Sequence, residues 1–320
     1  MLGFYILIFL LSCLVLTISS KWLVDALSKI ALFLKMKEFV VGFFIMAFAA
    51  SIPNFFVGII SALNKVPQLS FGDVTGGNIV DLSLIIGLAA LLSKGGLSAQ
   101  SRTVQGSAIF TILVGTLPLF LISDNYLSRL DGVLLILSFL LYISWLFSKK
   151  ERFAKIYNHS KEPLTLKYFF VNSFSLILSI ILLLAGAWGI VKSATFFSVA
   201  FNLPIGLIGL FIVGIGNSLP EAFFSVQAAK RGQDWMILGD LMGGIVMTAT
   251  LVLGIVALIC PIEIADFSPF AIARLFLIIS ALFFIFCVRT DRKITKREAL
   301  FAVSIYIFFL LAEIIRQWIK

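Results

Sequence analysis

The 320-residue sequence has few charged residues, one histidine and three cysteines. Charged residues make up only 13% of the chain, too few for the polar surface of a soluble domain of this length. The cysteines show no metal-ligand spacing, so zinc, copper and iron centres are not expected. The chain also lacks a phosphate-binding loop of the GxxxxGK[ST] type. We therefore expect neither an enzyme nor a machine driven by ATP.

Long apolar segments dominate the chain instead. Hydrophobic residues make up 61% of it, and the mean hydropathy is +1.11. About ten segments reach the roughly 17–25 residues that a helix needs to cross a bilayer. We place them at 3–20, 39–63, 72–93, 104–122, 130–148, 168–186, 204–228, 237–259, 268–288 and 298–315. The sequence therefore predicts an all-α polytopic membrane protein with ten transmembrane helices.

Positive charge is distributed unevenly between the loops. Of the 25 Lys and Arg residues, 19 fall in one alternating set of loops and five in the other, while Arg274 lies inside the ninth segment. Basic loops remain on the cytoplasmic side of a membrane. The bias therefore explains the net charge of +9 without a nucleic-acid partner and predicts that both termini lie outside. Short loops and the lack of a transit peptide favour a prokaryotic plasma membrane.

The sequence contains two related copies of one unit. At a spacing of 167 residues, seven residues of the first half fall on identical residues of the second half. Those of the first half are Ser51, Pro53, Gly72, Asp73, Gly76, Gly77 and Gly87. We therefore predict a five-helix repeat at 1–148, a basic cytoplasmic linker at 149–167 and a second five-helix repeat at 168–320. Because each copy has an odd number of spans, the second is inverted in the membrane, as is typical of transporters.

Each repeat carries a proline within its second apolar segment, in "AASIPNFFV" (49–57) and "GNSLPEAFF" (216–224). Pro53 and Pro220 have no amide hydrogen to donate to the carbonyls of Ala49 and Gly216. Unpaired carbonyls at membrane depth are costly unless they line a wet cavity or coordinate an ion. A kink healed by neighbouring helices is the alternative. Two symmetry-related breaks beside polar residues favour a functional site.

Two acids lie deep within apolar segments, Asp81 in the third and Glu221 in the seventh. Such groups cost about 2.5–3.5 kcal/mol or more at this depth, so they mark a functional pathway by default. A structural salt bridge with Lys192 or Arg274 is the alternative. Asp73 and Asp240 stand at the predicted starts of their helices, where an N-cap role is favoured over a ligand role.

The repeat relates the buried acids to neutral residues. When the two repeats are aligned, Asp81 corresponds to Thr248 and Glu221 corresponds to Asn54. Each half therefore offers oxygen atoms at the same two depths in the membrane. Carboxylate, amide, hydroxyl and carbonyl oxygens are hard donors that suit Ca²⁺ or Na⁺. The sequence therefore predicts a cation site at the centre of the membrane.

These motifs resemble the two alpha repeats of the calcium/cation antiporter superfamily, which includes sodium/calcium exchangers. "GNSLPE" (216–221) is a close match to the first family motif and "ASIPN" (50–54) a degraded one. "GDVTGGNIVD" (72–81) and "GDLMGGIVMT" (239–248) occupy the second motif. The resemblance covers nearly the whole chain. It implies a secondary antiporter that works by alternating access, with the first and sixth spans sliding across the rest.

The resemblance also implies a set of ion ligands. Glu221 matches the acid that binds both Ca²⁺ and Na⁺ in this family, and Ser51 and Ser218 match its hydroxyl ligands. Carbonyls around Ala47 and Gly214 match those that the kinked helices supply. Together with the residues chosen above, the predicted set is Glu221, Asp81, Asn54, Ser51, Ser218, Thr248, Asn217, Ala47 and Gly214.

The first repeat departs from the family pattern. Asn54 stands where that repeat normally has Glu, Asp81 where it often has Asn, and Ala50 and Asn217 occupy usual Thr positions. Two central carboxylates are fewer than prokaryotic sodium/calcium exchangers carry, which favours exchange of Ca²⁺ for Na⁺ or H⁺ with lower charge coupling, even electroneutral exchange.

Two other functions remain open at this stage. One is a monovalent cation/H⁺ or K⁺-linked exchanger, and the other is a non-transporting paralogue that serves as a membrane sensor or assembly subunit. The partners expected are inorganic cations and the lipid bilayer, with no ATP, no nucleic acid and no resident cofactor. A monomer is compatible with the sequence, which does not fix the oligomeric state.

Overall fold

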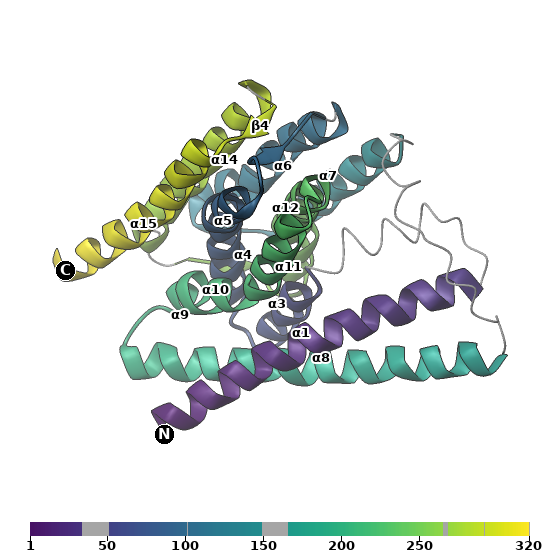
Figure 1. The fold of residues 1–320 in the computed structure, drawn as a ribbon. Helices are drawn as coiled ribbons and strands as arrows, with labels where there is room; N and C mark the ends of the chain where they lie inside the picture. The colour runs from purple at the N-terminus through teal and green to yellow at the C-terminus, as the bar shows by residue number, and fades with distance from the viewer. Residues whose placement is uncertain (34–50, 101, 149–165, 265–267, 291, 320) are drawn as a thin grey trace.

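A computed structural model describes residues 1–33, 51–100, 102–148, 166–264, 268–290 and 292–319. This part of the chain is almost entirely helical (Figure 1). The first repeat contains α1 (Leu2–Phe33), α3 (Ile52–Leu63), α4 (Gln68–Val80), η1 (Asp81–Ile85), α5 (Ile86–Leu92), α6 (Arg102–Leu121), η2 (Ile122–Asp124) and α7 (Arg129–Ser148). The second contains α8 (Leu166–Phe201), α9 (Ile205–Ile208), η4 (Gly209–Val213), α10 (Gly214–Asn217), α11 (Leu219–Lys230), α12 (Asp234–Val246), η5 (Met247–Val252), α13 (Leu253–Ile259), α14 (Ser268–Thr290) and α15 (Lys296–Ile319).

Nine helical segments in the described ranges are long and apolar enough to cross a membrane. They correspond to nine of the ten predicted spans, so the prediction of a polytopic helical membrane protein is confirmed. The described part of the remaining span is the 12-residue helix α3. Residues 39–50 of that span, and nearly all of the predicted linker at 149–167, lie outside the described ranges.

Two helices are longer than predicted. The spans placed at 3–20 and 168–186 belong to helices of 32 and 36 residues, α1 and α8. Ser20 is the last residue of the span placed at 3–20, and Lys21 and Lys192 lie beyond the predicted ends of the two spans, but all three lie inside the helices. The Ser20 hydroxyl donates to the Leu16 carbonyl one turn earlier, at 2.6 Å. Lysine is a good helix former, so a single polar residue does not end a helix here.

Helices α1 and α8 form a crossed pair along one side of the molecule (Figure 1). Phe9 and Leu16 of α1 and Leu183 of α8 belong to one buried cluster. The same cluster contains Ile52 of α3 and Val213 of η4. The pair therefore packs on the second spans of both repeats, apart from the larger hydrophobic cluster.

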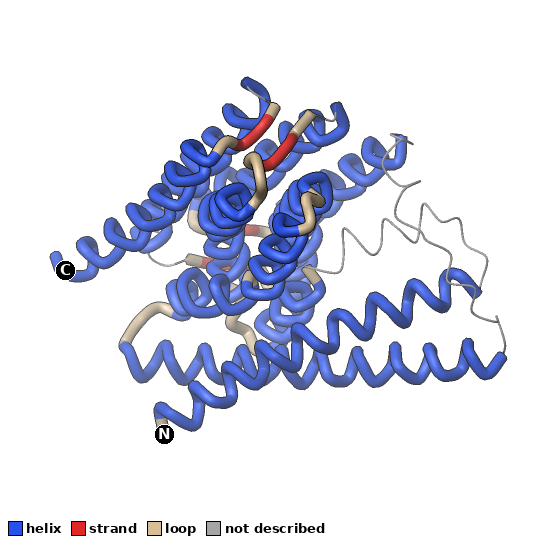
Figure 2. Tube along the Cα trace, in the orientation of Figure 1, coloured by secondary structure: helices blue, strands red, loops and turns tan. Residues whose placement is uncertain are grey.

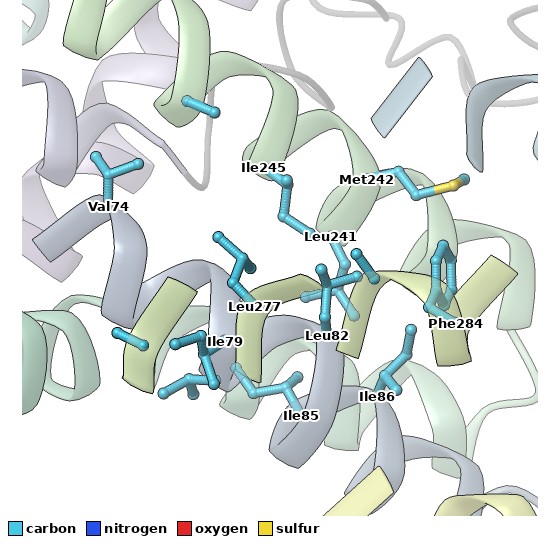
Figure 3. Packing of buried hydrophobic residues seen from close by; sticks show 14 of the residues in the cluster. Val74, Ile79, Leu82, Ile85, Ile86, Leu241, Met242, Ile245, Leu277 and Phe284 are labelled. Atoms are coloured by element: carbon cyan, nitrogen blue, oxygen red, sulfur yellow. The ribbon is translucent and has the colours of Figure 1, made fainter. Parts of the chain in front are cut away.

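The larger cluster joins the third spans of the two repeats. Figure 3 shows Val74 and Ile79 of α4 and Leu82 of η1 in one cluster with Leu241 of α12 and Phe284 of α14. Many large side chains on α1, α7, α8, α14 and α15 are exposed instead, including Phe4, Leu141, Phe174, Phe286 and Phe308. Apolar residues on the outer surface are expected where helices face lipid.

Short strands and helix caps show the twofold relation between the halves. Strand β1 (Leu97–Ser98) pairs with β4 (Lys293–Ile294), and β2 (Tyr126–Leu127) pairs with β3 (Ile262–Glu263), all antiparallel (Figure 2). Ser128 and Asp131 cap the start of α7 through reciprocal hydrogen bonds. Thr295 and Glu298 do the same for α15, 167 residues later. This capping box fixes where each fifth span begins.

Candidate functional site

A serine breaks the second span of the second repeat and directly precedes the described helix of that span in the first repeat. Ser51 precedes α3, and Ser218 separates α10 from α11. Both serines have nearly the same backbone angles, with φ of −87° and −81° and ψ close to zero. Pro53 and Pro220 lie in the first turn of the new helix, where a missing amide hydrogen does no harm. The predicted break is therefore present at Ser218, while the residues before Ser51 lie outside the described ranges.

The third span of each repeat contains a π-helical segment that the sequence did not predict. Asp81 is the first residue of η1, and Thr248 is the second residue of η5. π-Helical turns inside α-helices are rare and occur frequently at functional sites. The π-helical segments therefore begin at Asp81 in the first repeat and one residue before Thr248, its repeat equivalent, in the second.

Glycines bring the third span of the first repeat against the broken span of the second. A Cβ atom on Gly72 would lie 2.0 Å from the carbonyl oxygen of Gly206, and one on Gly76 would lie 2.0 Å from that of Leu210. A Cβ atom on Gly77 would lie 3.4 Å from the Ser218 hydroxyl oxygen. Backbone contact of this kind requires small residues. The close contact between the two backbones places Asp81, one turn beyond Gly77, at the break in the opposite repeat.

Asp81 and Glu221 meet at this break from different repeats. They are 8% and 9% exposed, so both are buried. The Ser218 hydroxyl forms a side-chain hydrogen bond with Asp81, and the charge of Asp81 acts on Glu221. Among the residues that the structure describes, Asp81 Oδ1 and Glu221 Oε2 have no hydrogen-bond partner. Two acids thus share one buried region with an unsatisfied oxygen on each, and we call them the acidic pair.

Neutral residues of the predicted set lie in the same layer. Asn54 is buried, and its Oδ1 has no hydrogen-bond partner. The Ser51 hydroxyl lies 3.4 Å from the Gly244 carbonyl oxygen. Thr248 donates to Oδ1 of Asn78 at 3.0 Å, across the two repeats. These contacts place the neutral oxygen atoms of both halves at the breaks.

Two main-chain ligands were also predicted. The Gly214 carbonyl accepts the Ser218 amide at 3.1 Å and keeps its second lone pair. Ala47 lies outside the described ranges.

The predicted cap role of Asp73 and Asp240 is wrong. α4 begins at Gln68 and α12 at Asp234, so both acids stand in helix interiors. Both are buried. Asn217, predicted as a cation ligand, donates its amide to both oxygen atoms of Asp73, at 3.2 and 3.0 Å. The glycines that follow these acids mark helix contacts, and they do not mark helix starts.

The structure therefore buries four acids at the repeat interface. The charges of Asp81, Asp240 and Asp73 all act on Glu221, in decreasing order. This corrects the count of two central carboxylates and removes the premise for lower charge coupling. The missed signal was spacing: Asp73 and Asp240 precede Asp81 and Thr248 by eight residues, which puts them on the same helix face.

Neither candidate salt bridge to the acidic pair is present among the described residues. The Lys192 ammonium lies 4.4 Å from the centre of the Trp188 ring, on α8. The Arg274 guanidinium lies 5.5 Å from the centre of the Phe120 ring. No three Asp, Glu, His or Cys side chains of this part of the chain form a metal site by themselves, so a cation here would also need neutral oxygen ligands.

A cavity of about 270 Å³ reaches the break next to Glu221. Its wall is formed by Thr17 and Lys21 of α1, and by Leu219, Pro220 and Phe223 of α11. Pro220 immediately precedes Glu221 in the sequence. The cavity therefore lies between α1 and the backbone that carries this acid.

Comparison with known proteins decides the family. The sequence pattern described as sodium/calcium exchanger protein matches residues 4–148 and 172–315. The chain belongs to the sodium/calcium exchanger protein family. It is therefore an integral membrane protein of the cation antiporter class.

Individual relatives of this family cover most of the chain. The sodium/calcium exchanger MaX1 of Methanosarcina acetivorans is 28% identical, over 95% of this chain and 97% of its own. The putative antiporter CaxA of Alkalimonas amylolytica is 30% identical, over 79% and 81%. A solved structure of the sodium-calcium exchanger NCX_Mj, soaked with Na⁺ and Sr²⁺, has a TM-score of 0.64 and 25% identity, covering 97% of this chain and 99% of that one. The predicted inverted-repeat fold agrees with this exchanger.

Proposed function

We propose that the protein exchanges Ca²⁺ for Na⁺ or H⁺ by alternating access at the acidic pair. The observation that carries this proposal is the meeting of Asp81 and Glu221, from opposite repeats, with an unsatisfied carboxylate oxygen on each. Buried carboxylates without a basic partner are costly, and a bound cation offsets that cost.

The surrounding atoms suit the proposed ion. Ca²⁺ takes six to eight oxygen ligands, which two acids alone do not supply. Asn54, Ser51, Ser218 and Thr248 lie at the same breaks with amide or hydroxyl oxygens, and the Gly214 carbonyl adds a main-chain oxygen. The names of the relatives, a sodium/calcium exchanger and a putative antiporter, agree with this ion class.

Alternating access would occur by movement of the crossed pair. Helices α1 and α8 have their own hydrophobic cluster and pack on the broken spans of both repeats. The cavity between α1 and Pro220 offers a route to Glu221 from one side. Sliding of α1 would close this route, and the inverted equivalent in the other repeat would open toward the opposite side.

The proposal includes the setting of the protein. The loop charges favour both termini outside, and the short loops suit a prokaryotic plasma membrane. The driving force would be an ion gradient, without ATP or a resident cofactor, and the transported cations would be the substrates. A single copy carries both halves of the site, so one chain is sufficient.

A specific observation favours one alternative. Asn54, an amide, stands at the repeat position of Glu221, and Thr248 stands at that of Asp81. Fewer acids at these two depths would suit exchange of monovalent cations, namely Na⁺ for H⁺ or a K⁺-linked exchange.

Tracer Ca²⁺ uptake into proteoliposomes tests the proposal. Purified protein is reconstituted, and uptake is driven in turn by an outward Na⁺ gradient and by a pH gradient. Uptake with either gradient is expected. Na⁺ or K⁺ flux without Ca²⁺ flux would favour the monovalent alternative. No flux of any cation would contradict transport and favour a sensor or assembly role.

A further inference from the structure

Two symmetry-related acids have different surroundings. Asp73 is fully buried, and both of its carboxylate oxygens accept the side-chain amide of Asn217. Its repeat partner Asp240 is 9% exposed, and within the described part of the chain Oδ2 of Asp240 has no hydrogen-bond partner. Asp73 and Asp240 therefore occupy equivalent positions in the two repeats, but among the described residues only Asp73 has hydrogen-bond partners for both carboxylate oxygens.

The sequence explains this difference. The residue 167 positions before Asn217 is Ala50, whose side chain has no hydrogen-bond donor. The first repeat therefore cannot offer Asp240 the amide that the second repeat offers Asp73. A buried polar atom without a partner costs about 1–3 kcal/mol, and more when it is charged. A cation is the partner that would remove this cost.

Asp240 also lies on the helix face that is turned toward the acidic pair. Asp240, Gly244 and Thr248 are spaced by four residues along the third span, so they share one face. Gly244 lies beside the Ser51 hydroxyl, and Thr248 donates to Asn78 in the opposite repeat. The charge of Asp240 acts on Asp81 more strongly than that of Asp73 does.

We propose that Asp240 holds an additional monovalent cation beside the acidic pair, and that Asp73, held by Asn217, holds none. One carboxylate balances a single positive charge, whereas the two carboxylates of the acidic pair balance a divalent ion. The exchanger would then bind one more Na⁺ than the acidic pair alone can neutralise. This inference rests on the proposed function for its role in exchange, but Na⁺ binding itself can be measured separately.

Equilibrium binding of radioactive Na⁺ to the purified full-length protein in detergent tests the inference. The variants are Asp240→Asn, Asp240→Glu and the matched control Asp73→Asn, each first checked for monodisperse elution. Asp240→Asn is expected to lose one bound Na⁺, or to raise the Na⁺ concentration for half-saturation of that ion about tenfold. Asp240→Glu keeps the carboxylate and is expected to retain the ion, which also guards against a folding defect. Asp73→Asn is expected to bind Na⁺ like the unmodified protein.

Two results would overturn the inference. One is unchanged Na⁺ binding in Asp240→Asn, and the other is an equal loss in both Asn variants. Na⁺-driven Ca²⁺ efflux from proteoliposomes is measured in parallel, and Asp240→Asn is expected to exchange one Na⁺ fewer per Ca²⁺. Failure of the unmodified protein to move Ca²⁺ would contradict the proposed function, while the binding comparison would still test Asp240.

Discussion

Glu221 is a buried acid whose polar surroundings are incomplete among the described residues, and it is the acid on which the proposed cation site depends. It is buried in the first turn of α11, directly after Pro220, and its Oε2 has no partner. Its charged neighbours among the described residues are other acids. Glu313 provides a contrast, since it is also buried in a membrane helix but accepts a hydrogen bond from Arg316 at 2.9 Å. One acid is paired within its helix, and the other faces the opposite repeat.

Glu221→Gln is expected to abolish Ca²⁺ exchange. Loss of one partner of a buried charge pair costs about 2–5 kcal/mol, so Ca²⁺ affinity should fall on the order of 100-fold or more. The measurement is tracer Ca²⁺ uptake into proteoliposomes over a range of Ca²⁺ concentrations. Glu313→Gln is the control and should retain uptake. Normal flux in Glu221→Gln would remove this acid from the site.

At the scale of elements, the site depends on how closely α4 approaches the broken seventh span. Gly72 and Gly76 face backbone atoms of Gly206 and Leu210, with no space for a side chain. Gly77 faces the Ser218 hydroxyl at an ordinary contact distance. The first two glycines therefore set the separation of the helices, and the third leaves room beside the site.

Gly76→Ala is expected to destabilise the fold, because its Cβ would overlap the Leu210 carbonyl and the backbones would have to separate. Overpacking of this kind costs about 1–3 kcal/mol, occasionally more. Thermal unfolding of the purified protein in detergent measures the effect. Gly77→Ala, one residue away, should unfold close to the unmodified protein. Equal melting temperatures for the two variants would show that the contact is not tight.

The crossed pair is the element expected to move. Thr17 of α1 and Phe223 of α11 line the same cavity beside the break. In a variant whose Cys13, Cys260 and Cys287 are replaced, cysteines at these two positions can be joined by a short bifunctional reagent. Cross-linking is expected to stop Ca²⁺ exchange, and a reducible linker should restore it on cleavage.

The control for this experiment joins Tyr126 and Glu263, which face each other in the β2–β3 pair and are exposed. A link there stays within the fixed part of the molecule and should leave exchange unchanged. Exchange that continued with α1 and α11 linked would argue against sliding of α1.

At the scale of the whole molecule, the inverted repeat gives one chain two equivalent halves with opposite orientations in the membrane. The capping boxes of α7 and α15 stand 167 residues apart, β4 follows β2 at the same spacing, and β3 follows β1 at nearly that spacing. A site at the interface of two inverted halves can be reached by equivalent routes from opposite sides. The loop charges then decide which side each route faces.

Both termini are expected to lie outside. A C-terminal phosphatase fusion, which is active only outside the cytoplasm, should be active, and a fluorescent fusion that matures only in the cytoplasm should be dark. A truncated chain that ends in the basic loop near residue 150 is the control and should give the reverse result. The opposite pattern for the full-length chain would contradict the charge-based orientation.

The sequence by itself determined the class, the duplication and the positions of the helix breaks. These depend on local properties: apolar length, the missing amide hydrogens of Pro53 and Pro220, and the repetition of small residues at one spacing. It also identified Glu221 and Asp81 as buried acids, because charge within an apolar segment is visible without a fold.

Only the tertiary structure decided which polar groups meet. Asn217 and Asp73 are 144 residues apart, and their contact depends on backbone packing at glycines from both repeats. The sequence predicts caps at Asp73 and Asp240 because local sequence does not distinguish a glycine at a helix start from one at a helix crossing. Partner choice across an interface depends on the distance and angle between helices, which packing sets and no single segment encodes.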